Sequence, residues 1–325
     1  MKKIIGIGNA LVDVIVKIPD EEILHTFTLP KGGMEMIDVE KKRELHRHIG
    51  KWKQTMASGG STSNTIHGIA RLGGTTGYIG KVGRDEMGLF FEKDMFKSHI
   101  TPHLIHTDEM DTGIATTLMT EDAERTFATY LGAAASLSIE DIDNDILKQY
   151  DCIHVEGYLI FNEPLTLKVC EMAKANGMLI SMDMASFNLV EEHHDFITNL
   201  LKDYVDIIFA NEEEAKAFAH CEGEDALDIL FQYCPVAVVK LGGKGSLANV
   251  HGKKIHCGTN GQKPIDTNGA GDAFAAGFLY GLLNDFTPEK TLRLASRLGD
   301  EMVATIGAKL SEEQWEKIRN EKDLF

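Results

Sequence analysis

The chain has 325 residues, of which 43% are hydrophobic and 26% charged, a composition typical of globular proteins that excludes disordered, fibrous and disulfide-scaffold chains. The 50 acidic and 33 basic residues give a formal net charge of −17, so we expect no nucleic-acid partner. The 5 cysteines form no CxxC pair, and the apolar runs are too short for a signal peptide or a membrane span. These features predict a cytoplasmic protein with reduced thiols and no membrane partner.

Short apolar runs typical of buried parallel strands recur along the chain, at 3–7, 76–79, 152–155, 179–183, 205–209 and 236–241. Helical patterns follow most of them, at 61–72, 86–97, 164–176, 212–219 and 226–233. Three further helical patterns end the chain, at 270–283, 288–306 and 311–319. This alternation predicts an α/β fold in which helices flank a mostly parallel central sheet.

Two stretches break the alternation, 14–38 and 101–130, with strand-like pieces at 12–18, 113–119 and 126–130. We expect them to pair as a small β-sheet lid over the edge of the main sheet. The α/β core then consists of 1–13, 39–100 and 131–325. Two separate surface hairpins are the alternative.

The segment with the most chemical information is Asp-Thr-Asn-Gly-Ala-Gly-Asp-Ala-Phe at 266–274. Gly269, Ala270 and Gly271 lead directly into a helix and leave its first backbone N–H groups unobstructed, which favours an anion site for a phosphoryl group. Asp272, in the first turn, is the candidate general base that accepts a proton from an acceptor hydroxyl. The alternative is that Asp272 only complements the helix dipole.

This segment resembles the C-terminal signature of the ribokinase-like (PfkB) family of sugar and nucleoside kinases. A second family signature, Gly-Gly-Ser-Thr-Ser-Asn-Thr, stands upstream at 59–65. Weaker matches at 6–13, 211–214 and 240–246 extend the resemblance over nearly the whole chain. The resemblance implies a three-layer ribokinase-like fold and a kinase that transfers the γ-phosphoryl group of ATP, with Mg²⁺, to an alcohol.

The predicted acceptor site combines a carboxylate, two glycines and an amide. Asp13 can accept hydrogen bonds from two sugar hydroxyls, although an exposed turn aspartate is the alternative. Gly59 and Gly60 let the backbone approach a ligand, and Asn64 offers a donor and an acceptor. The resemblance assigns sugar-holding roles to Asp13, Gly60 and Asn64.

Within the family, the sequence of these motifs is most similar to the adenosine kinase branch. Asn268, together with Asn9 near the first strand, is typical of that branch, where the asparagine at the start reaches toward the base. Tyr158 lies where the branch stacks an aromatic ring on adenine, although the neighbouring aromatic of the branch is either replaced by Leu159 or shifted by one residue. We therefore expect a nucleoside acceptor. A kinase for ribose, fructose or a related sugar is the alternative, and a non-catalytic small-molecule sensor is the alternative of another class.

The remaining site residues concern the nucleotide and its ions. The predicted nucleotide-binding residues are Asn211, Glu214, Lys240, Gly242, Gly245 and Thr267. The resemblance implies that Glu214 supports Mg²⁺ through water and that Asp266, with carbonyls of 306–308, binds a monovalent cation such as K⁺. Arg125, on the return strand of the lid, is expected to add positive charge at the acceptor site when the lid closes. Both a monomer and a homodimer are compatible with the lid segments.

Overall fold

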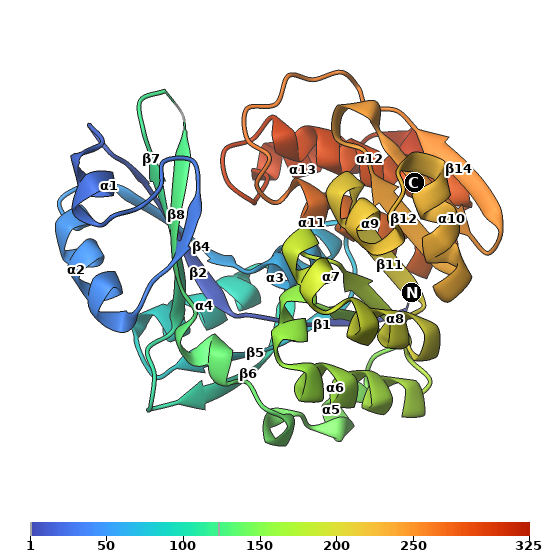
Figure 1. Cartoon of the computed structure of the whole chain (residues 1–325), viewed down its shortest axis with the longest axis horizontal. Helices are drawn as coiled ribbons and strands as arrows, with labels where there is room; N and C mark the ends of the chain where they lie inside the picture. Colours follow the sequence, from blue (N-terminus) through green and yellow to red (C-terminus); the bar gives the residue numbers. More distant parts are fainter. Residues whose placement is uncertain (1, 123) are drawn as a thin grey trace.

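The large sheet explains the apolar runs of the sequence. The structure is a computed structural model that describes residues 2–122 and 124–325, and its larger sheet has the strand order β14-β13-β12-β11-β10-β9-β1-β5-β6 (Figure 1). The bounds of these strands are β1 (Ile4–Ile7), β5 (Thr76–Gly83), β6 (Ile100–Thr107), β9 (Cys152–Val155), β10 (Leu179–Asp183), β11 (Ile207–Asn211), β12 (Val236–Lys240), β13 (Ser246–Val250) and β14 (Lys253–Cys257). The seven strands from β12 through β1 to β6 in this spatial order pair in parallel. Strands β13 and β14 pair antiparallel at one edge of the sheet.

Strand β1 is central, and all of its residues are buried. It pairs in parallel with β5 on one side and β9 on the other, so that Ile4 lies opposite both Thr76 and Cys152. The chain therefore adds β5 and β6 on one side of β1 and then adds β9 and the later strands on the other side. In sheets of this kind, ligands bind at the carboxyl ends of the strands where the order reverses.

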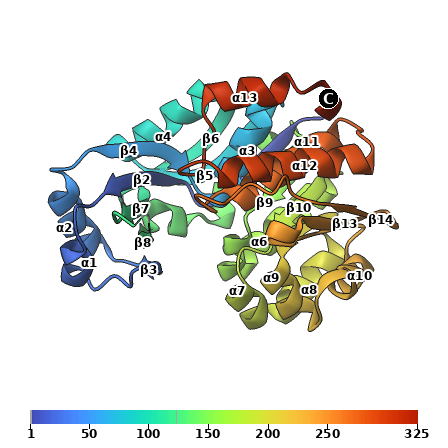
Figure 2. The same cartoon turned by 90° about the horizontal axis from the view of Figure 1, so that it is seen from above.

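Helices cover both faces of this sheet (Figure 2). One face carries α3 (Ser61–Arg71), α4 (Glu86–Lys97), α11 (Ala270–Leu283), α12 (Pro288–Val303) and α13 (Glu312–Arg319). The other carries α5 (Asn144–Leu147), α6 (Glu163–Ala175), α7 (Phe187–Glu192), α8 (His194–Asp203), α9 (Glu212–Ala219) and α10 (Gly223–Tyr233). Short 3₁₀ helices lie at Gly132–Ser136, Ile139–Asp141, Gly157–Phe161, Gly242–Lys244 and Lys322–Leu324.

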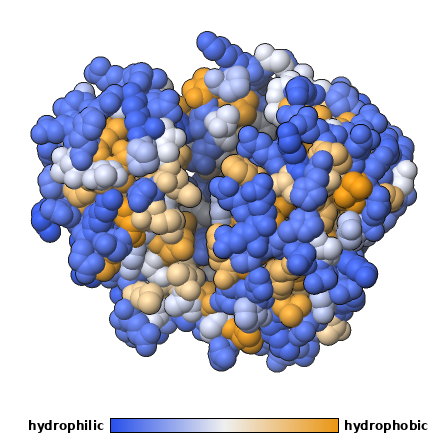
Figure 3. All heavy atoms as spheres, viewed as in Figure 1, coloured by the Kyte–Doolittle hydropathy of each residue, from blue (hydrophilic) through white to orange (hydrophobic). Residues whose placement is uncertain are grey.

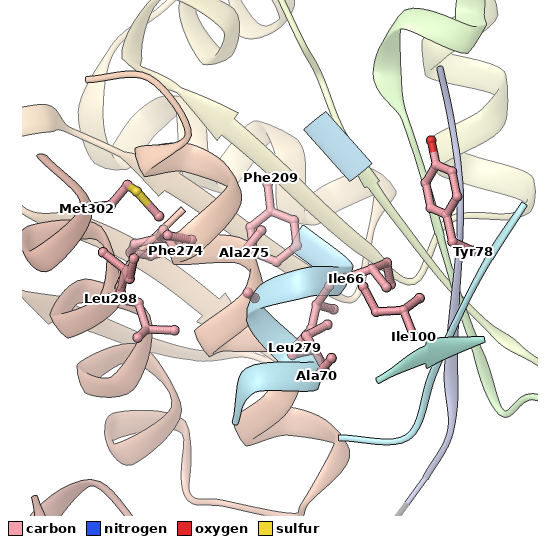
Figure 4. Packing of buried hydrophobic residues seen from close by; sticks show 14 of the residues in the cluster. Ile66, Ala70, Tyr78, Ile100, Phe209, Phe274, Ala275, Leu279, Leu298 and Met302 are labelled. Carbon is pink, nitrogen blue, oxygen red and sulfur yellow. The ribbon is translucent and has the colours of Figure 1, made fainter. Parts of the chain in front are cut away.

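The packing of α3 and α11 holds two motif-bearing helices side by side. Ile66 and Ala70 of α3 lie in one buried cluster with Ala275 and Leu279 of α11, and Phe209 of β11 packs beneath (Figure 4). Gly68 permits the close approach, because a Cβ there would lie 2.6 Å from the Cβ of Ala276. The first turns of both helices, which carry the two signature motifs, are thereby fixed relative to each other.

The smaller sheet has the order β3-β8-β7-β2-β4. Its strands are β2 (Leu11–Lys17), β3 (Met34–Met36), β4 (Gln54–Gly59), β7 (Gly113–Met119) and β8 (Arg125–Tyr130), and α1 (Glu22–Thr26) and α2 (Val39–Ile49) accompany it. Val12, Val14 and Val16 are buried on one face, while the alternate residues of β2 point to the other.

The predicted fold class is confirmed, since both the mostly parallel sheet with flanking helices and the second, smaller sheet are present. Two strands lie across the expected boundaries of the lid: β4 belongs to the smaller sheet and β6 to the large one. Helix α12 ends at Val303 rather than at 306, ahead of Gly307 with a φ of +88°. No helix among the described residues is long and apolar enough to cross a membrane.

Candidate active site

Asp272 lies in the first turn of α11, at the carboxyl edge of the large sheet. The first intrahelical hydrogen bond runs from the Ala273 N–H to the Gly269 carbonyl, so the N–H groups of Gly271 and Asp272 precede the helical ladder. Gly269 needs to be glycine, because its φ is +71° and a Cβ there would lie 2.7 Å from the Cβ of Ala308. This arrangement is suited to an anion, with a carboxylate beside it.

The first turn of α3 holds the carboxylate of Asp272 in place. The Ser61 hydroxyl donates to Oδ1 at 2.7 Å, and the Asn64 amide donates to Oδ2 at 3.0 Å. Burial raises the pKa of Asp272 to about 6, although these two hydrogen bonds oppose the increase. Asp272 is thus ionised at neutral pH and basic enough to accept a proton from a hydroxyl.

Asn64 also offers a free acceptor. Its Oδ1 is buried and has no hydrogen-bond partner within the described chain, while its Nδ2 donates to Asp272. A hydroxyl placed between the two side chains can donate to either oxygen. The predicted residues Asn64 and Asp272 therefore share one position suited to an acceptor hydroxyl.

The two predicted glycines are needed for close approach. A Cβ on Gly59 would lie 2.2 Å from the Asp13 Oδ1, so the Asp13 carboxylate rests on this glycine. Gly60 has a φ of +93°, and a Cβ there would lie 2.2 Å from the Asn9 carbonyl oxygen. Asp13, Asn9 and the start of α3 thus converge on the Gly59–Gly60 pair.

Asn9 is held by a buried carboxylate that the motifs did not indicate. Glu156, directly after β9, accepts the Asn9 Nδ2 at 2.6 Å, the Asn9 N–H at 3.2 Å and the Thr62 N–H at 3.2 Å. Burial raises the pKa of Glu156 to about 7. An acidic residue that directly follows a buried parallel strand was the available sequence signal.

The predicted nucleotide residue Lys240 lies beside the anion site. Its Nζ would be 3.2 Å from a Cβ on Gly271, and it forms an ion pair with Asp183 at 2.8 Å. Burial opposes the charged form, but Asp183 and Glu214 outweigh it and leave the pKa of Lys240 above its ordinary value. Asp183, at the end of β10, is a second site residue that the sequence reasoning missed.

Asn211 and Glu214 form a reciprocal cap at the start of α9. The Asn211 N–H donates to Glu214 Oε2 at 2.7 Å, and the Glu214 N–H donates to Asn211 Oδ1 at 2.8 Å. Burial, followed by the charge of Asp183, raises the pKa of Glu214 to about 7. The pair lies at the same edge of the sheet as Lys240, which suits a role through water beside bound phosphates.

The chemistry of this edge suits Mg²⁺, a cation that prefers oxygen ligands and usually keeps several waters. Asp183 and Glu214 supply carboxylates next to the anion site. Residues 2–122 and 124–325 contain no group of three or more His, Cys, Asp or Glu side chains arranged to hold a metal ion. Phosphate oxygens would complete the coordination of a Mg²⁺ bound here.

Arg125 and Asp266 contact each other. The Arg125 guanidinium of β8 forms an ion pair with the Asp266 carboxylate, which also accepts the Asn268 N–H at 2.9 Å and the Gly307 N–H at 2.7 Å. Asp266 is therefore surrounded by donors, whereas a K⁺ site needs oxygen ligands. In this arrangement Arg125 connects the smaller sheet to the segment before α11. The K⁺ site at Asp266 and the role of Arg125 at the acceptor site stay predictions.

The remaining predicted residues are Tyr158, Gly242, Gly245 and Thr267, which differ in their exposure. Tyr158 is 36% exposed; burial raises the pKa of its phenol, and so do the charges of Glu156, Glu214, Asp183 and Asp272, which lie near it. Gly242 and Thr267 are exposed. Gly245, with a φ of +97°, packs against β14, since a Cβ there would lie 2.0 Å from the Cys257 carbonyl oxygen. Figure 3 shows a hollow between the part that carries the smaller sheet and the part that carries the large one.

A helix start with free N–H groups, the Asp272 carboxylate beside it and a cluster of polar side chains between two sheets are features of a phosphotransferase of the ribokinase-like class. The chain matches the pfkB family carbohydrate kinase description over residues 31–315 and belongs to that family. It is 31% identical to the adenosine kinase structure from Sinorhizobium meliloti, with a TM-score of 0.86 and 98% of each chain covered. A probable sugar kinase from Rhizobium etli is 28% identical, with a TM-score of 0.87 and 99% of each chain covered.

One curated relative is named for a sugar substrate. The 5-dehydro-2-deoxygluconokinase of Geobacillus kaustophilus is 30% identical over 77% of this chain and 80% of its own length. The chain is therefore a PfkB-family kinase whose relatives include both adenosine kinases and sugar kinases.

Proposed function

We propose that this kinase transfers the γ-phosphoryl group of ATP to a primary hydroxyl of an adenosine-like nucleoside. The observation that carries the choice of acceptor is the face of the smaller sheet that contains Asp13. By register, Asp13, Ala115, Thr129 and Met36 form one row across this face, and Ile15, Thr117, Phe127 and Met34 form the next. The carboxylate of Asp13 thus shares one face of the smaller sheet with apolar and aromatic side chains.

The edge of this face is exposed, and the face lies close to the segment after α12. Met34 is 58% exposed, and a Cβ on Gly307 would lie 3.2 Å from the Ile15 Cδ1. Methionine and phenylalanine side chains pack better against the flat apolar surface of a nucleobase than against the hydroxyl groups of a free sugar. Tyr158, which is partly exposed and lies near the charges of Glu156 and Asp272, supplies a ring for stacking.

In the proposed reaction, Asp13 and the free Asn64 Oδ1 orient the ribose, and Asp272 accepts the proton of the attacking hydroxyl. The N–H groups of Gly271 and Asp272, with the Lys240 ammonium, stabilise the charge on the transferring oxygens. Bound Mg²⁺, supported by Glu214 through water, would neutralise phosphate charge. Closure of the smaller sheet as a lid would exclude water from the phosphoryl group.

A sugar kinase is the second candidate, favoured by the relative named 5-dehydro-2-deoxygluconokinase. The two candidates differ in what they require of Tyr158. Removal of a stacking ring weakens nucleobase binding by about 1–3 kcal/mol, whereas a free sugar has no base to lose.

The test measures ADP release with Mg²⁺ and ATP for adenosine, inosine, ribose, fructose and 5-dehydro-2-deoxygluconate. The proposal predicts turnover of a nucleoside, a KM for it that rises about 5- to 150-fold in Tyr158→Ala, and near-normal KM in Tyr158→Phe, which keeps the ring. Turnover of free sugars alone, with no effect of Tyr158→Ala, would overturn the nucleoside assignment.

A further inference from the structure

A buried lysine behind the acceptor subsite has no role in the reaction as described so far. Lys309, in the segment between α12 and α13, donates to the Ser58 hydroxyl at 2.5 Å and to Asp94 Oδ2 at 2.9 Å. Its side chain is only 17% exposed. Burial lowers the pKa of Lys309, and Asp94 limits the decrease.

The cluster joins three separate elements around the strand that supports Asp13. Asp94 of α4 accepts both the N–H and the hydroxyl of Ser58, at 2.9 and 2.7 Å. Ser58 lies on β4 opposite Val12, the residue before Asp13. It also directly precedes Gly59, on which the Asp13 carboxylate rests. Ser58 and Asp94 thus hold Lys309 behind the strand that supports Asp13, and Asp13 itself forms no hydrogen bond with Lys309 within the described chain.

The charges that act on Asp13 are few. Burial raises the pKa of Asp13 to about 7, the charge of Lys309 opposes the increase, and the charge of Asp272 adds to it. Asp94, from α4, has its own pKa lowered to about 2 by Lys309 and Ser58 although burial opposes this, so it is ionised. His67, from α3, has a pKa lowered to about 3 by burial and by Lys309, so it is neutral.

We propose that Lys309 is a positioning residue for the acceptor subsite, which fixes the β4 strand on which the Asp13 carboxylate rests and places a positive charge that favours the ionised form of that carboxylate. The inference rests on the proposed function in one respect, namely that Asp13 holds the acceptor. Only an ionised Asp13 accepts hydrogen bonds from two hydroxyls at once, so acceptor binding depends on the charge of Lys309. Asp94 weakens the effect of Lys309 on Asp13, because it forms an ion pair with the same ammonium group.

Two substitutions should act in opposite directions. Lys309→Met removes the cation and should move the ionisation of Asp13 to higher pH, whereas Asp94→Asn leaves the cation undivided and should move it to lower pH. Lys309→Arg should stay close to wild type. Loss of packing alone cannot produce shifts of opposite sign.

The first measurement is the pH dependence of KM for whichever acceptor the enzyme turns over, from about pH 5 to about pH 9. Lys309→Met should raise the acceptor KM about tenfold at neutral pH, with recovery toward high pH and an unchanged KM for ATP. The matched control is Lys81→Met, which breaks an equally buried lysine–aspartate pair with Asp141. A pH-independent increase in KM, or an equal effect in the control, would overturn the proposal.

The second measurement does not need turnover. The carboxyl shift of Asp13, in protein labelled at its aspartate carboxyls and assigned with Asp13→Asn, reports the ionisation directly. A midpoint that rises in Lys309→Met and falls in Asp94→Asn supports the proposal, and identical midpoints refute it. Failure of every acceptor in the panel would instead count against the proposed function, so the two failures are distinguishable.

Discussion

The substitution Gly60→Ala tests whether the acceptor subsite depends on close backbone approach. A side chain at φ +93° is strained, and its Cβ would lie 2.2 Å from the Asn9 carbonyl oxygen. The matched control is Gly73→Ala, at φ +95°, where a Cβ meets no atom within 4 Å. The control should lose about 1–2 kcal/mol of unfolding free energy from backbone strain alone.

Gly60→Ala should lose about 2–5 kcal/mol, because overpacking adds about 1–3 kcal/mol to the backbone strain of a side chain at positive φ. Relief of the contact must displace Asn9 or the start of α3, so the acceptor KM should also rise in this variant and not in the control. Guanidinium denaturation gives the free energies and ADP release gives KM. Equal losses in the two variants with an unchanged acceptor KM would refute the reasoning.

Two further predictions concern buried carboxylates. Because the pKa of Glu156 rises to about 7 in the folded protein, above its ordinary 4.5, the folded state retains a proton that the unfolded chain releases, and stability falls as the pH rises between these values. Urea denaturation of Glu156→Gln across this range should show a flatter decline, and a slope equal to wild type would contradict the burial argument. Arg125→Met and Asp266→Asn should be non-additive by about 1–3 kcal/mol in a double-mutant cycle of unfolding free energies, whereas additivity would mean that their ion pair contributes nothing.

Sequence periodicity predicted the parallel strands β1, β5 and β9 to β12, most of whose residues are buried, but not the antiparallel strand β13, although all of its residues are buried. The runs at 152–155 and 179–183 are β9 and β10, because such strands are apolar throughout. Strand β14 was not predicted, since it is an edge strand with exposed Lys253 and Lys254 and carries no continuous apolar run. The same holds for β4, whose partner strand comes from a distant part of the chain.

The site followed the same division. Motifs indicated Asp272 and Asn64, because their chemistry lies in local sequence at helix starts, and the structure brings them within hydrogen-bond distance. Asp183 and Lys309 were missed because their roles depend on partners far along the chain, Lys240 and Asp94 respectively. The pairing of Arg125 with Asp266 likewise arises from the placement of β8 near the segment that precedes α11 and has no local sequence pattern.

The central claim is that Asp272 is the base that accepts the proton of the acceptor hydroxyl, and Asp272→Asn tests it most directly. The amide can still accept from Ser61, so the fold should persist, and ATP binding should stay near the wild-type level. Phosphorylation of the acceptor should fall about 10²- to 10⁴-fold in ADP-release assays. An Asp272→Asn enzyme with activity within about tenfold of wild type would contradict the assignment of Asp272 as general base.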